Sequence, residues 1–303
     1  MFELVNFGSL CIDNVYSVPS IARPGETVTA LEQTRFAGGK GLNQSIAAAR
    51  AGCAVAHVGC VGDDGRLLVE TLAEAGVDTA GIRSIVGGRS GHAVVQVDAA
   101  GSNAIVIVGG ANRLTDASDS RRALSLVAHD GWLLLQNEIN DIEDVLVAAR
   151  AQGTRVAMNL APTDGRESTY DLGALDLLVV NVLEAAALTG ETQPERAVDA
   201  IAARHPTLDL VVTRGHEGLH YGRGAERLRL GAFRVNAVDE TAAGDAFTGF
   251  LLAAWIHGAP RLDALVRASA AGALAVTRAG AAPSIPTSSE VDIFLAERRH
   301  ELS

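Results

Sequence analysis

A run of small residues, Thr241-Ala242-Ala243-Gly244, leads directly into Asp245 and an apolar helical pattern. The spacing of the apolar residues predicts a helix that starts near Ala243. Small residues leave the first N–H groups of such a helix accessible, so these groups and the positive dipole end form an anion site. A carboxylate beside an anion site suits transfer of a charged group to a hydroxyl, with Asp245 as the base. The alternative is that Asp245 only complements the helix dipole.

A second motif of this kind is the glycine-rich run Gly38-Gly39-Lys40-Gly41-Leu42-Asn43-Gln44, which holds the only lysine of the chain. It lacks the glycines of a Walker A loop and of a dinucleotide fingerprint, since Thr34 and Gln44 stand at positions that need glycine. Its glycines allow the backbone to approach a ligand closely, with Asn43 on the first turn of the following helix. The alternative is a tight turn that feeds a packed helix.

Polar residues follow several apolar runs at the points where strands of an α/β sheet would end. Such ends converge on one crevice in an open sheet, so these residues are candidates for one site. Taken singly, each is a helix cap or a loop residue, and for Asn159 the cap is the favoured interpretation. The residues are Asp13, Asn112, Asn137, Glu138, Asn159, Asn181, Glu184, Thr213 and Gly215.

The bulk composition limits the classes of function. The chain has 303 residues, of which 48% are hydrophobic, and no apolar run approaches the ~20 residues of a membrane span. A net charge of −11 argues against nucleic-acid binding, although a local cluster of donors can still hold a nucleotide. The N-terminus lacks the pattern of a secretory signal, and Cys11, Cys53 and Cys60 lack C-x-x-C spacing. We therefore expect reduced cysteines, no zinc site and a cytoplasmic location.

The alternation of apolar patterns predicts an α/β fold: a doubly wound, mostly parallel sheet flanked by helices, in a single domain over residues 1–303. A small β-sheet lid is expected to be inserted from about residues 10–18, 27–36 and 88–108, the last as a hairpin of 92–98 and 104–108. The expected core strands are 4–9, 54–60, 82–86, 132–136, 154–159, 175–180, 208–213, 217–221 and 226–230. The expected helices, besides the one after the glycine motif, are 67–75, 141–151, 182–189, 194–204, 243–257 and 261–277.

Both motifs resemble signatures of the ribokinase-like, or PfkB, carbohydrate kinases. The run from Gly38 to Gln44 is similar to the N-terminal signature of that family, and Asp239–Phe247 is similar to its C-terminal signature. Val276–Ser284 and Gly8-Ser9 with Asp13 resemble ribokinases within the family. The resemblance covers essentially the whole chain and implies a doubly wound core with a lid that closes over a sugar and often forms a homodimer.

The resemblance also implies a role for individual residues. Asp245 would be the catalytic base, and the backbone N–H groups of Ala242, Ala243 and Gly244 would form the anion hole. The remaining residues would bind sugar, nucleotide or metal. The sugar-binding set is Asp13, Gly39, Lys40, Asn43, Glu138 and Asp245. The ATP and Mg²⁺ set is Asn181, Glu184, Thr213, Gly215, Gly244 and Ser269. The K⁺ set is Asp239, Thr241, Ala275, Arg278, Gly280 and Ser284.

The implied activity is ATP-dependent phosphorylation of a small sugar at a primary hydroxyl, with D-ribose as the first candidate. A nucleoside, another pentose or a ketose is the alternative substrate, and a sugar-binding sensor without turnover is the alternative from another class. A dehydrogenase lacks support because the glycine fingerprint is incomplete. Ribokinases usually carry asparagine at the position of Cys11 and alanine at that of Leu42, so we expect a less polar pocket and a higher KM for ribose.

Overall fold

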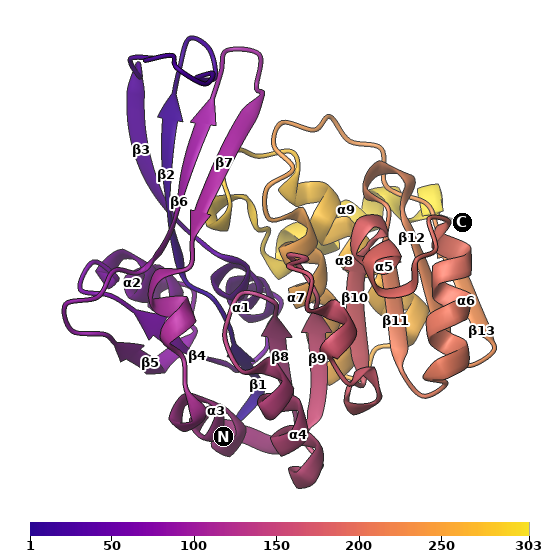
Figure 1. Cartoon of the computed structure of the whole chain (residues 1–303). Coiled ribbons are helices and arrows are strands. Elements are labelled where there is room, and N and C mark those ends of the chain that lie inside the picture. The colour runs from indigo at the N-terminus through magenta and orange to yellow at the C-terminus, as the bar shows by residue number, and fades with distance from the viewer. Residues whose placement is uncertain (303) are drawn as a thin grey trace.

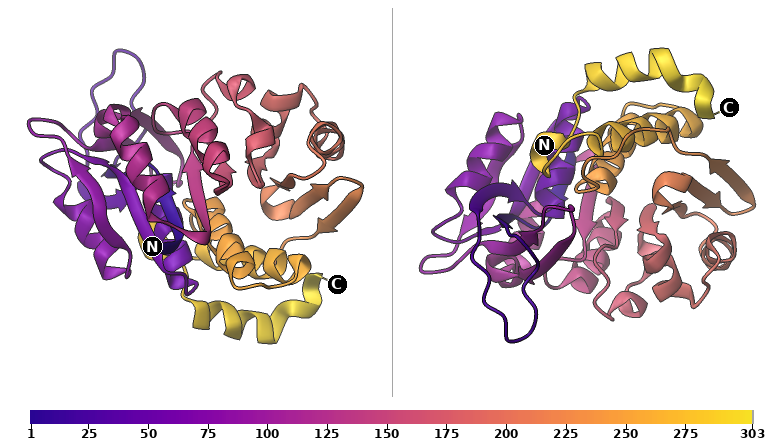
Figure 2. Two further views of the ribbon diagram at one scale, coloured as in Figure 1. Left: turned by 90° about the horizontal axis from the view of Figure 1, so that it is seen from below. Right: turned by 90° about the horizontal axis from the view of Figure 1, so that it is seen from above.

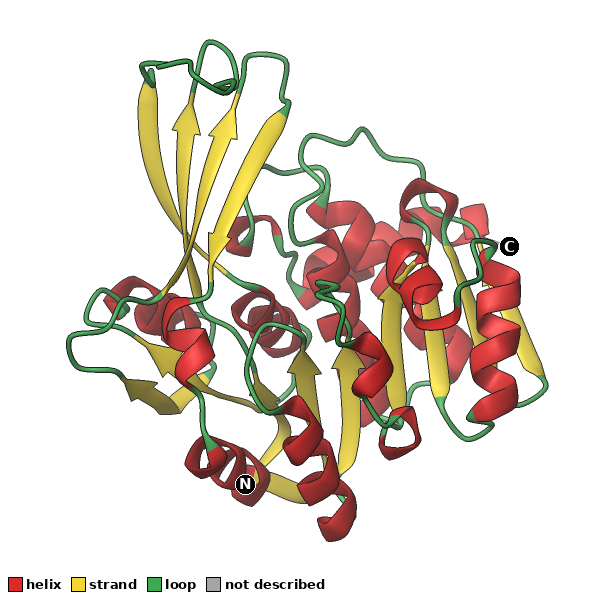
Figure 3. Ribbon diagram, viewed as in Figure 1, coloured by secondary structure: helices red, strands yellow, loops and turns green. Residues whose placement is uncertain are grey.

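The computed structural model describes residues 1–302, and the main sheet of this part of the chain has nine strands. The sheet runs in the order β13-β12-β11-β10-β9-β8-β1-β4-β5, parallel except for the β11-β12-β13 edge (Figures 1 and 3). This confirms the expected fold class. The strands are β1 (Phe2–Phe7), β4 (Val55–Val61), β5 (Asp78–Ser84), β8 (Val127–Gln136), β9 (Arg155–Asn159), β10 (Leu177–Asn181), β11 (Asp209–Thr213), β12 (Leu219–Arg223) and β13 (Glu226–Leu230).

Helices cover both faces of this sheet because its central strands are apolar on both sides. In β1, for example, Leu4 belongs to one hydrophobic cluster and Val5 to the other. The first cluster is covered by α1 (Lys40–Arg50), α2 (Arg66–Glu74), α7 (Ala243–Ile256), α8 (Arg261–Ala275) and α9 (Ser288–Arg298). The second is covered by α3 (Ala117–Leu126), α4 (Ile142–Gln152), α5 (Val182–Thr189) and α6 (Pro194–Arg204). Figure 2 shows α7, α8 and α9 together on one side of the sheet.

Short 3₁₀ helices connect several of these elements. They are η1 (Gly110–Leu114), η2 (Glu167–Thr169), η3 (Leu172–Ala174), η4 (Gly215–Glu217), η5 (Ala282–Ser284) and η6 (Arg299–Leu302). No helix within residues 1–302 is both long enough and apolar enough to cross a bilayer.

A second, four-stranded sheet in the described chain projects from the core at the top of Figure 1. We call it the lid sheet. Its order is β3-β2-β6-β7, with β2 and β6 parallel and the other pairs antiparallel. The strands are β2 (Cys11–Ser17), β3 (Glu32–Gly38), β6 (Gly91–Val97) and β7 (Asn103–Val108).

The expected strand at residues 27–36 was placed too early. β3 begins at Glu32, which pairs with Ser17, the last residue of β2. Since β2 ends there and Pro19 follows, the β-favouring residues at Thr27 and Val28 have no neighbouring strand to pair with. Helix α3 was also missed, although Asp116 and Asp119 form a capping box at its start.

Helices α1 and α7 are in close contact, and a glycine makes this contact possible. A Cβ atom at Gly249 would lie 2.4 Å from Cβ of Ala47 and 2.7 Å from the backbone nitrogen of Ala48. The two helices therefore pack at backbone distance, with their buried faces against each other. Because of this packing, the first turns of α1 and α7, which carry the two sequence motifs, lie beside each other.

Candidate active site

Helix α7 starts at Ala243, as its sequence pattern predicts, and Ala242 before it has left-handed dihedral angles (φ 62°). A left-handed alanine is strained, and such strain is concentrated at functional positions. A Cβ atom at Gly244 would meet nothing within 4 Å, so the first turn faces open space. Of the N–H groups expected to bind an anion, that of Ala243 makes a long bond of 3.3 Å to the carbonyl of Glu240. This first turn can therefore receive an anionic group.

Asp245 on that turn is buried and accepts amide hydrogens on both carboxylate oxygens. Asn43 Nδ2 donates to Oδ2 at 3.0 Å, and Gln44 Nε2 donates to Oδ1 at 2.8 Å. Because a carboxylate only accepts, the donor side of the Asn43 amide must face Asp245. The acceptor, Asn43 Oδ1, is buried and has no hydrogen-bond partner within residues 1–302. It is therefore placed to accept a hydrogen bond from a ligand hydroxyl.

Gln44 belongs to a chain of buried amides that sequence reasoning missed. Its Nε2 also donates to Asn159 Oδ1 at 3.1 Å, and its Oε1 accepts from Gln136 Nε2 at 2.8 Å. Gln136 donates further to Asn6 Oδ1 at 3.0 Å. The helix-cap interpretation of Asn159 is thus wrong, because its side chain turns inward and supports Gln44. No local pattern in the sequence marks this chain of contacts, since its members come from α1 and three different strands.

Glu138 connects the end of β8 with the glycine motif. Its Oε2 accepts a hydrogen bond from the Ser9 hydroxyl and another, of 3.2 Å, from the backbone N–H of Lys40. Burial by itself would lower the pKa of the Lys40 ammonium. Three carboxylates, those of Asp245, Glu138 and Glu184, attract its charge more strongly and raise the pKa. The lysine therefore remains charged at the centre of the acidic site.

Of the two residues that depart from the ribokinase pattern, Leu42 lies differently from our expectation. Leu42 is fully buried in the core between α1 and the sheet, so the expectation that it makes the pocket less polar is wrong. Cys11 is buried, and its Sγ lies 3.5 Å from Asn112 Nδ2. The Asn112 amide also pairs with both backbone polar groups of Leu10, at 2.9 and 3.0 Å. Asn112 thereby fixes the start of β2.

Asn181 and Glu184 form a capping box at the start of α5. The Asn181 side chain accepts the N–H of Glu184 at 2.9 Å, and Glu184 accepts the N–H of Asn181 at 2.8 Å. Burial raises the pKa of Glu184, while Lys40 and the Asn181 N–H counteract this increase. The pair is thus a helix cap, as its alternative interpretation held, and its carboxylate also interacts with the Lys40 charge. Oxygen atoms of this type suit Mg²⁺ and its waters.

Of the residues expected at the nucleotide, Thr213 lies beside this cap and Ser269 lies on α8. Thr213 at the end of β11 pairs in register with Asn181, and Gly215 follows in η4 with a positive φ of 55°. Ser269 is half-buried on α8, one turn before Gly272. A Cβ atom at Gly272 would lie 3.2 Å from the carbonyl oxygen of Ala243, so α8 borders the first turn of α7.

Asp239 ties the segment before α7 to the loop after α8. Its Oδ2 accepts the N–H of Gly280 at 2.9 Å, and its Oδ1 accepts the N–H of Thr241 at 2.9 Å. The guanidinium of Arg278 donates a hydrogen bond to Glu290 in α9 at 2.6 Å. Ala275 and Ser284 are buried at either end of the same loop. A carboxylate such as that of Asp239, together with backbone carbonyl oxygens of a loop, is a ligand set that fits a large monovalent cation.

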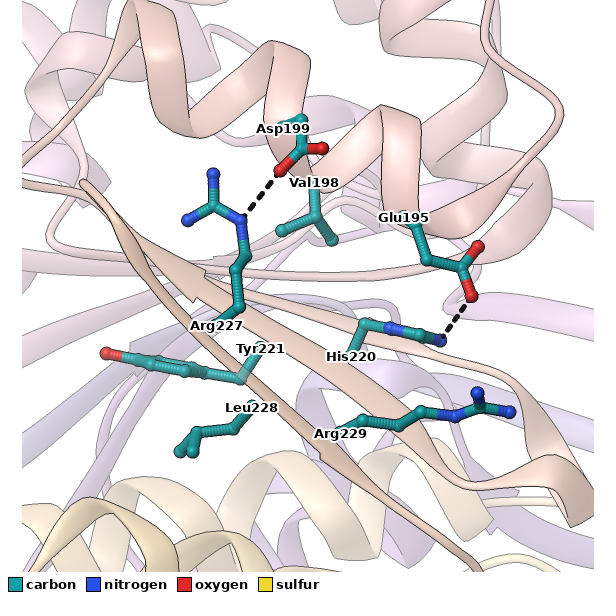
Figure 4. Close-up of a pocket in the computed structure, with 8 residues that line it drawn as sticks. All are labelled: Glu195, Val198, Asp199, His220, Tyr221, Arg227, Leu228 and Arg229. Carbon is teal, nitrogen blue, oxygen red and sulfur yellow. Dashed lines mark hydrogen bonds and ion pairs between the residues drawn. The ribbon is translucent and has the colours of Figure 1, made fainter.

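A separate hollow of about 310 Å³ lies between α6 and the β12–β13 hairpin (Figure 4). A contact of 3.3 Å between Glu195 and His220 and an ion pair of 2.8 Å between Asp199 and Arg227 border it. Its lining includes none of the expected site residues. It is therefore distinct from the site at Asp245.

Comparison with known proteins agrees with this arrangement. The family model for pfkB family carbohydrate kinases matches residues 1–288. The chain belongs to this family. A ribokinase from Haemophilus influenzae is 34% identical over 96% of this chain and 98% of its own.

Solved structures resemble this pfkB carbohydrate kinase over nearly its full length. The ribokinase of Thermotoga maritima has a TM-score of 0.86 at 32% identity and covers 98% of this chain and 100% of its own. The ribokinase of Arabidopsis thaliana, complexed with ribose and ATP, has a TM-score of 0.85 at 30% identity, over 97% and 98% of the two chains. The core and the lid sheet are thus shared with ribokinases.

The partly buried carboxyl group of Asp13 is expected to lower the free energy of unfolding of this pfkB kinase at neutral pH. Burial, and then repulsion from Glu138, raise the pKa of Asp13 from 3.8 to about 6. A raised pKa in the folded state means that stability falls as pH rises from about 4 to about 6, because the folded chain must release a proton that it holds more tightly. Asp13→Asn should therefore raise the free energy of unfolding at pH 7.5 by about 1–3 kcal/mol. The measurement is urea unfolding of both proteins at several pH values.

The pH dependence is the internal control for this variant. The gain from Asp13→Asn should shrink as pH falls through about 6 and vanish below about 4, where Asp13 binds a proton in both the folded and the unfolded chain. An equal gain in the free energy of unfolding at every pH, or a loss at pH 7.5, would contradict the conclusion that the folded state disfavours the charged form of Asp13.

Proposed function

We propose that this chain is an ATP-dependent kinase that transfers a phosphoryl group to the primary hydroxyl of D-ribose. The observation that carries the proposal is Asp245, held by Asn43 and Gln44 on the open first turn of α7. The ribokinases with which the chain aligns over nearly all of its length support ribose as the substrate. The sugar would lie between the glycine motif and the lid sheet.

In this reaction the oxygen of the sugar hydroxyl attacks the terminal phosphate of ATP, Asp245 accepts the proton of that hydroxyl, and ADP leaves. The first-turn N–H groups of α7 stabilise the charge on the phosphoryl group in transfer. Asp13, Asn43 and Glu138 hold the other hydroxyls, and Lys40 balances the negative charges around them. A Mg²⁺ ion near Asn181 and Glu184, when bound, would neutralise charge on the ATP phosphates.

A panel of acceptors tests the proposal directly. ADP formation should be measured with D-ribose, 2-deoxyribose, a ketohexose and a nucleoside. Ribose should be phosphorylated, with a raised KM because the Cys11 thiol makes only weak hydrogen bonds. If only a ketohexose or a nucleoside reacts, ribose is the wrong substrate and the kinase assignment remains. If ribose binds without any turnover, the chain is a sensor.

We also propose that K⁺ activates the enzyme from the loop that Asp239 joins to Gly280. The bond of 2.9 Å between these residues places the loop directly behind the turn at Thr241 and Ala242. A bound cation would fix that turn and so aim the N–H groups of α7 at the phosphate. We expect turnover to be higher in KCl than in tetramethylammonium chloride at equal ionic strength. Equal rates in the two salts would contradict this role.

The lid sheet is proposed to pair two chains into a homodimer. Four consecutive residues of its edge strand β7, Ile105 to Val108, have 43–63% of their surface exposed. An apolar edge strand of this kind pairs with another chain unless it is covered. We expect a dimer in sedimentation at micromolar protein concentration, and Ile107→Lys should produce a monomer. A wild-type monomer with ribose present would contradict the proposal.

The state of the cysteines indicates the cellular compartment of the enzyme. Cys11, Cys53 and Cys60 are buried and unpaired in the described chain. Unpaired thiols are typical of reducing compartments. We therefore infer a cytoplasmic enzyme.

A further inference from the structure

Three side chains with different ligand atoms lie close together where helices α1 and α7 end. Glu3 lies on β1, Cys53 follows α1, and His257 follows α7. A carboxylate oxygen, the Cys53 Sγ and an imidazole nitrogen of His257 all lie within 4.8 Å of one another. The distance between Glu3 Oε2 and His257 Nε2 is 3.8 Å.

The chemistry of this group matches a transition metal of borderline softness. Thiolate, imidazole and carboxylate are the three ligand types of protein-bound zinc. An oxygen and a nitrogen bound at about 2.0–2.1 Å in a tetrahedron lie about 3.4 Å apart, so the 3.8 Å between Glu3 and His257 needs to shorten only slightly. Small side-chain rotations would bring Cys53 Sγ to the same separation.

The electrostatic surroundings favour a cation at this position. Both α1 and α7 end here, and the C-terminal end of a helix carries partial negative charge. The nearest basic residue of α1, Arg50, directs its guanidinium elsewhere, to the carbonyl groups of Ala282 and Ile285. The negative ends of two helices and the Glu3 carboxylate thus lie at the same place, where they favour a bound cation.

The group also has an oriented ligand and an entry path. The backbone N–H of Ala54 donates to Glu3 Oε2 at 2.8 Å, which holds the carboxylate in place as an outer-shell contact does in metal sites. Cys53 is buried, whereas the side chains of Glu3 and His257 are each 44% exposed. A metal ion can therefore enter from solvent.

We propose that Glu3, Cys53 and His257 bind one zinc ion, with water as the fourth ligand. The ion would join the start of β1, the turn after α1 and the end of α7. Binding exchanges the thiol proton of Cys53 for the metal, and no electrons are transferred. The spacing of the three residues in the sequence gives no sign of such a site, which explains why cysteine spacing alone predicts none. This proposal does not depend on the kinase function.

Titration of the metal-free full-length protein with Co²⁺ tests the site by spectroscopy. Wild-type protein should bind one Co²⁺ per chain with a thiolate-to-cobalt charge-transfer band, and Zn²⁺ should displace it. Cys53→Ser should lose the band, and His257→Gln should weaken binding by roughly 100-fold or more, since loss of a ligand exceeds loss of an outer-shell contact. Zn²⁺ should raise the Tm of the wild-type protein and of neither variant.

Matched controls separate this site from general metal binding. Cys60→Ser and His129→Gln change the same residue types elsewhere, and both should retain the band and the Tm increase. His257 is partly exposed, so His257→Gln is expected to fold even if Cys53→Ser does not. Absence of the band in wild-type protein, or its persistence in Cys53→Ser or undiminished affinity in His257→Gln, would overturn the proposal.

Discussion

The Asp245→Asn variant should lose about 10²–10⁴-fold in kcat, with sugar binding mostly retained. The substitution keeps the size of the side chain and its place on the first turn of α7, but it removes the group that accepts the proton. The amides of Asn43 and Gln44 currently donate to both carboxylate oxygens. The asparagine can still accept from one of them. The measurement is ATP turnover with ribose, together with ribose binding by calorimetry.

A matched control distinguishes a catalytic base from an acid that only complements a helix dipole. Asp144 is the third residue of α4, as Asp245 is of α7, and it is exposed to solvent. Asp144→Asn removes the dipole interaction alone and should leave kcat unchanged. Wild-type turnover in Asp245→Asn, or equal losses in both variants, would rule out the base.

The second large effect is expected from Gly41→Ala. A Cβ atom at Gly41 would lie 2.4 Å from the nitrogen of Ser9 and 2.6 Å from its carbonyl oxygen, so backbone atoms would have to move. The first turn of α1 would shift away from β1 and carry Asn43 with it. Displacement of about 1 Å in such a site can cost about 10²-fold in kcat/KM. Overpacking should also lower the free energy of unfolding by about 1–3 kcal/mol.

Gly231→Ala is the matched control for this prediction. A Cβ atom at Gly231 meets nothing within 4 Å, and its φ is not positive. Its kinetics and stability should remain close to those of the wild-type protein. If Gly41→Ala behaves in the same way, the close approach of α1 to Ser9 does not position the site.

The sequence motifs were sufficient to locate the start of α7 and the βα order of the core. Small residues before an apolar period of 3.6 indicate a helix start without any tertiary information. The buried amides behind Asp245 could not be found in this way. Gln136 and Asn6 contact Gln44 only because β8, β1 and α1 are adjacent in the fold.

The predictions from sequence that were wrong have one physical origin in common. Asn159 follows an apolar strand, as a helix cap would, but its neighbour in space is Gln44. Leu42 lies within the glycine motif, yet the turn of α1 directs it into the core. For residues 27–31, β-branched side chains favour a strand, but the partner strand has already ended. In each case a tertiary neighbour decides the role of the residue.

The glycine contact between α1 and α7 has a consequence for motion. Because Gly249 brings α7 to within backbone distance of Ala47 and Ala48, sliding or opening between the two helices would lose dense packing. Asn43 and Asp245 therefore move as parts of one rigid platform. The lid sheet, in contrast, stands clear of the core except where its strands enter it (Figure 1). Any closure around a substrate must then occur by hinging at the base of those strands, near Leu10 and Gly38, while the reacting groups stay still.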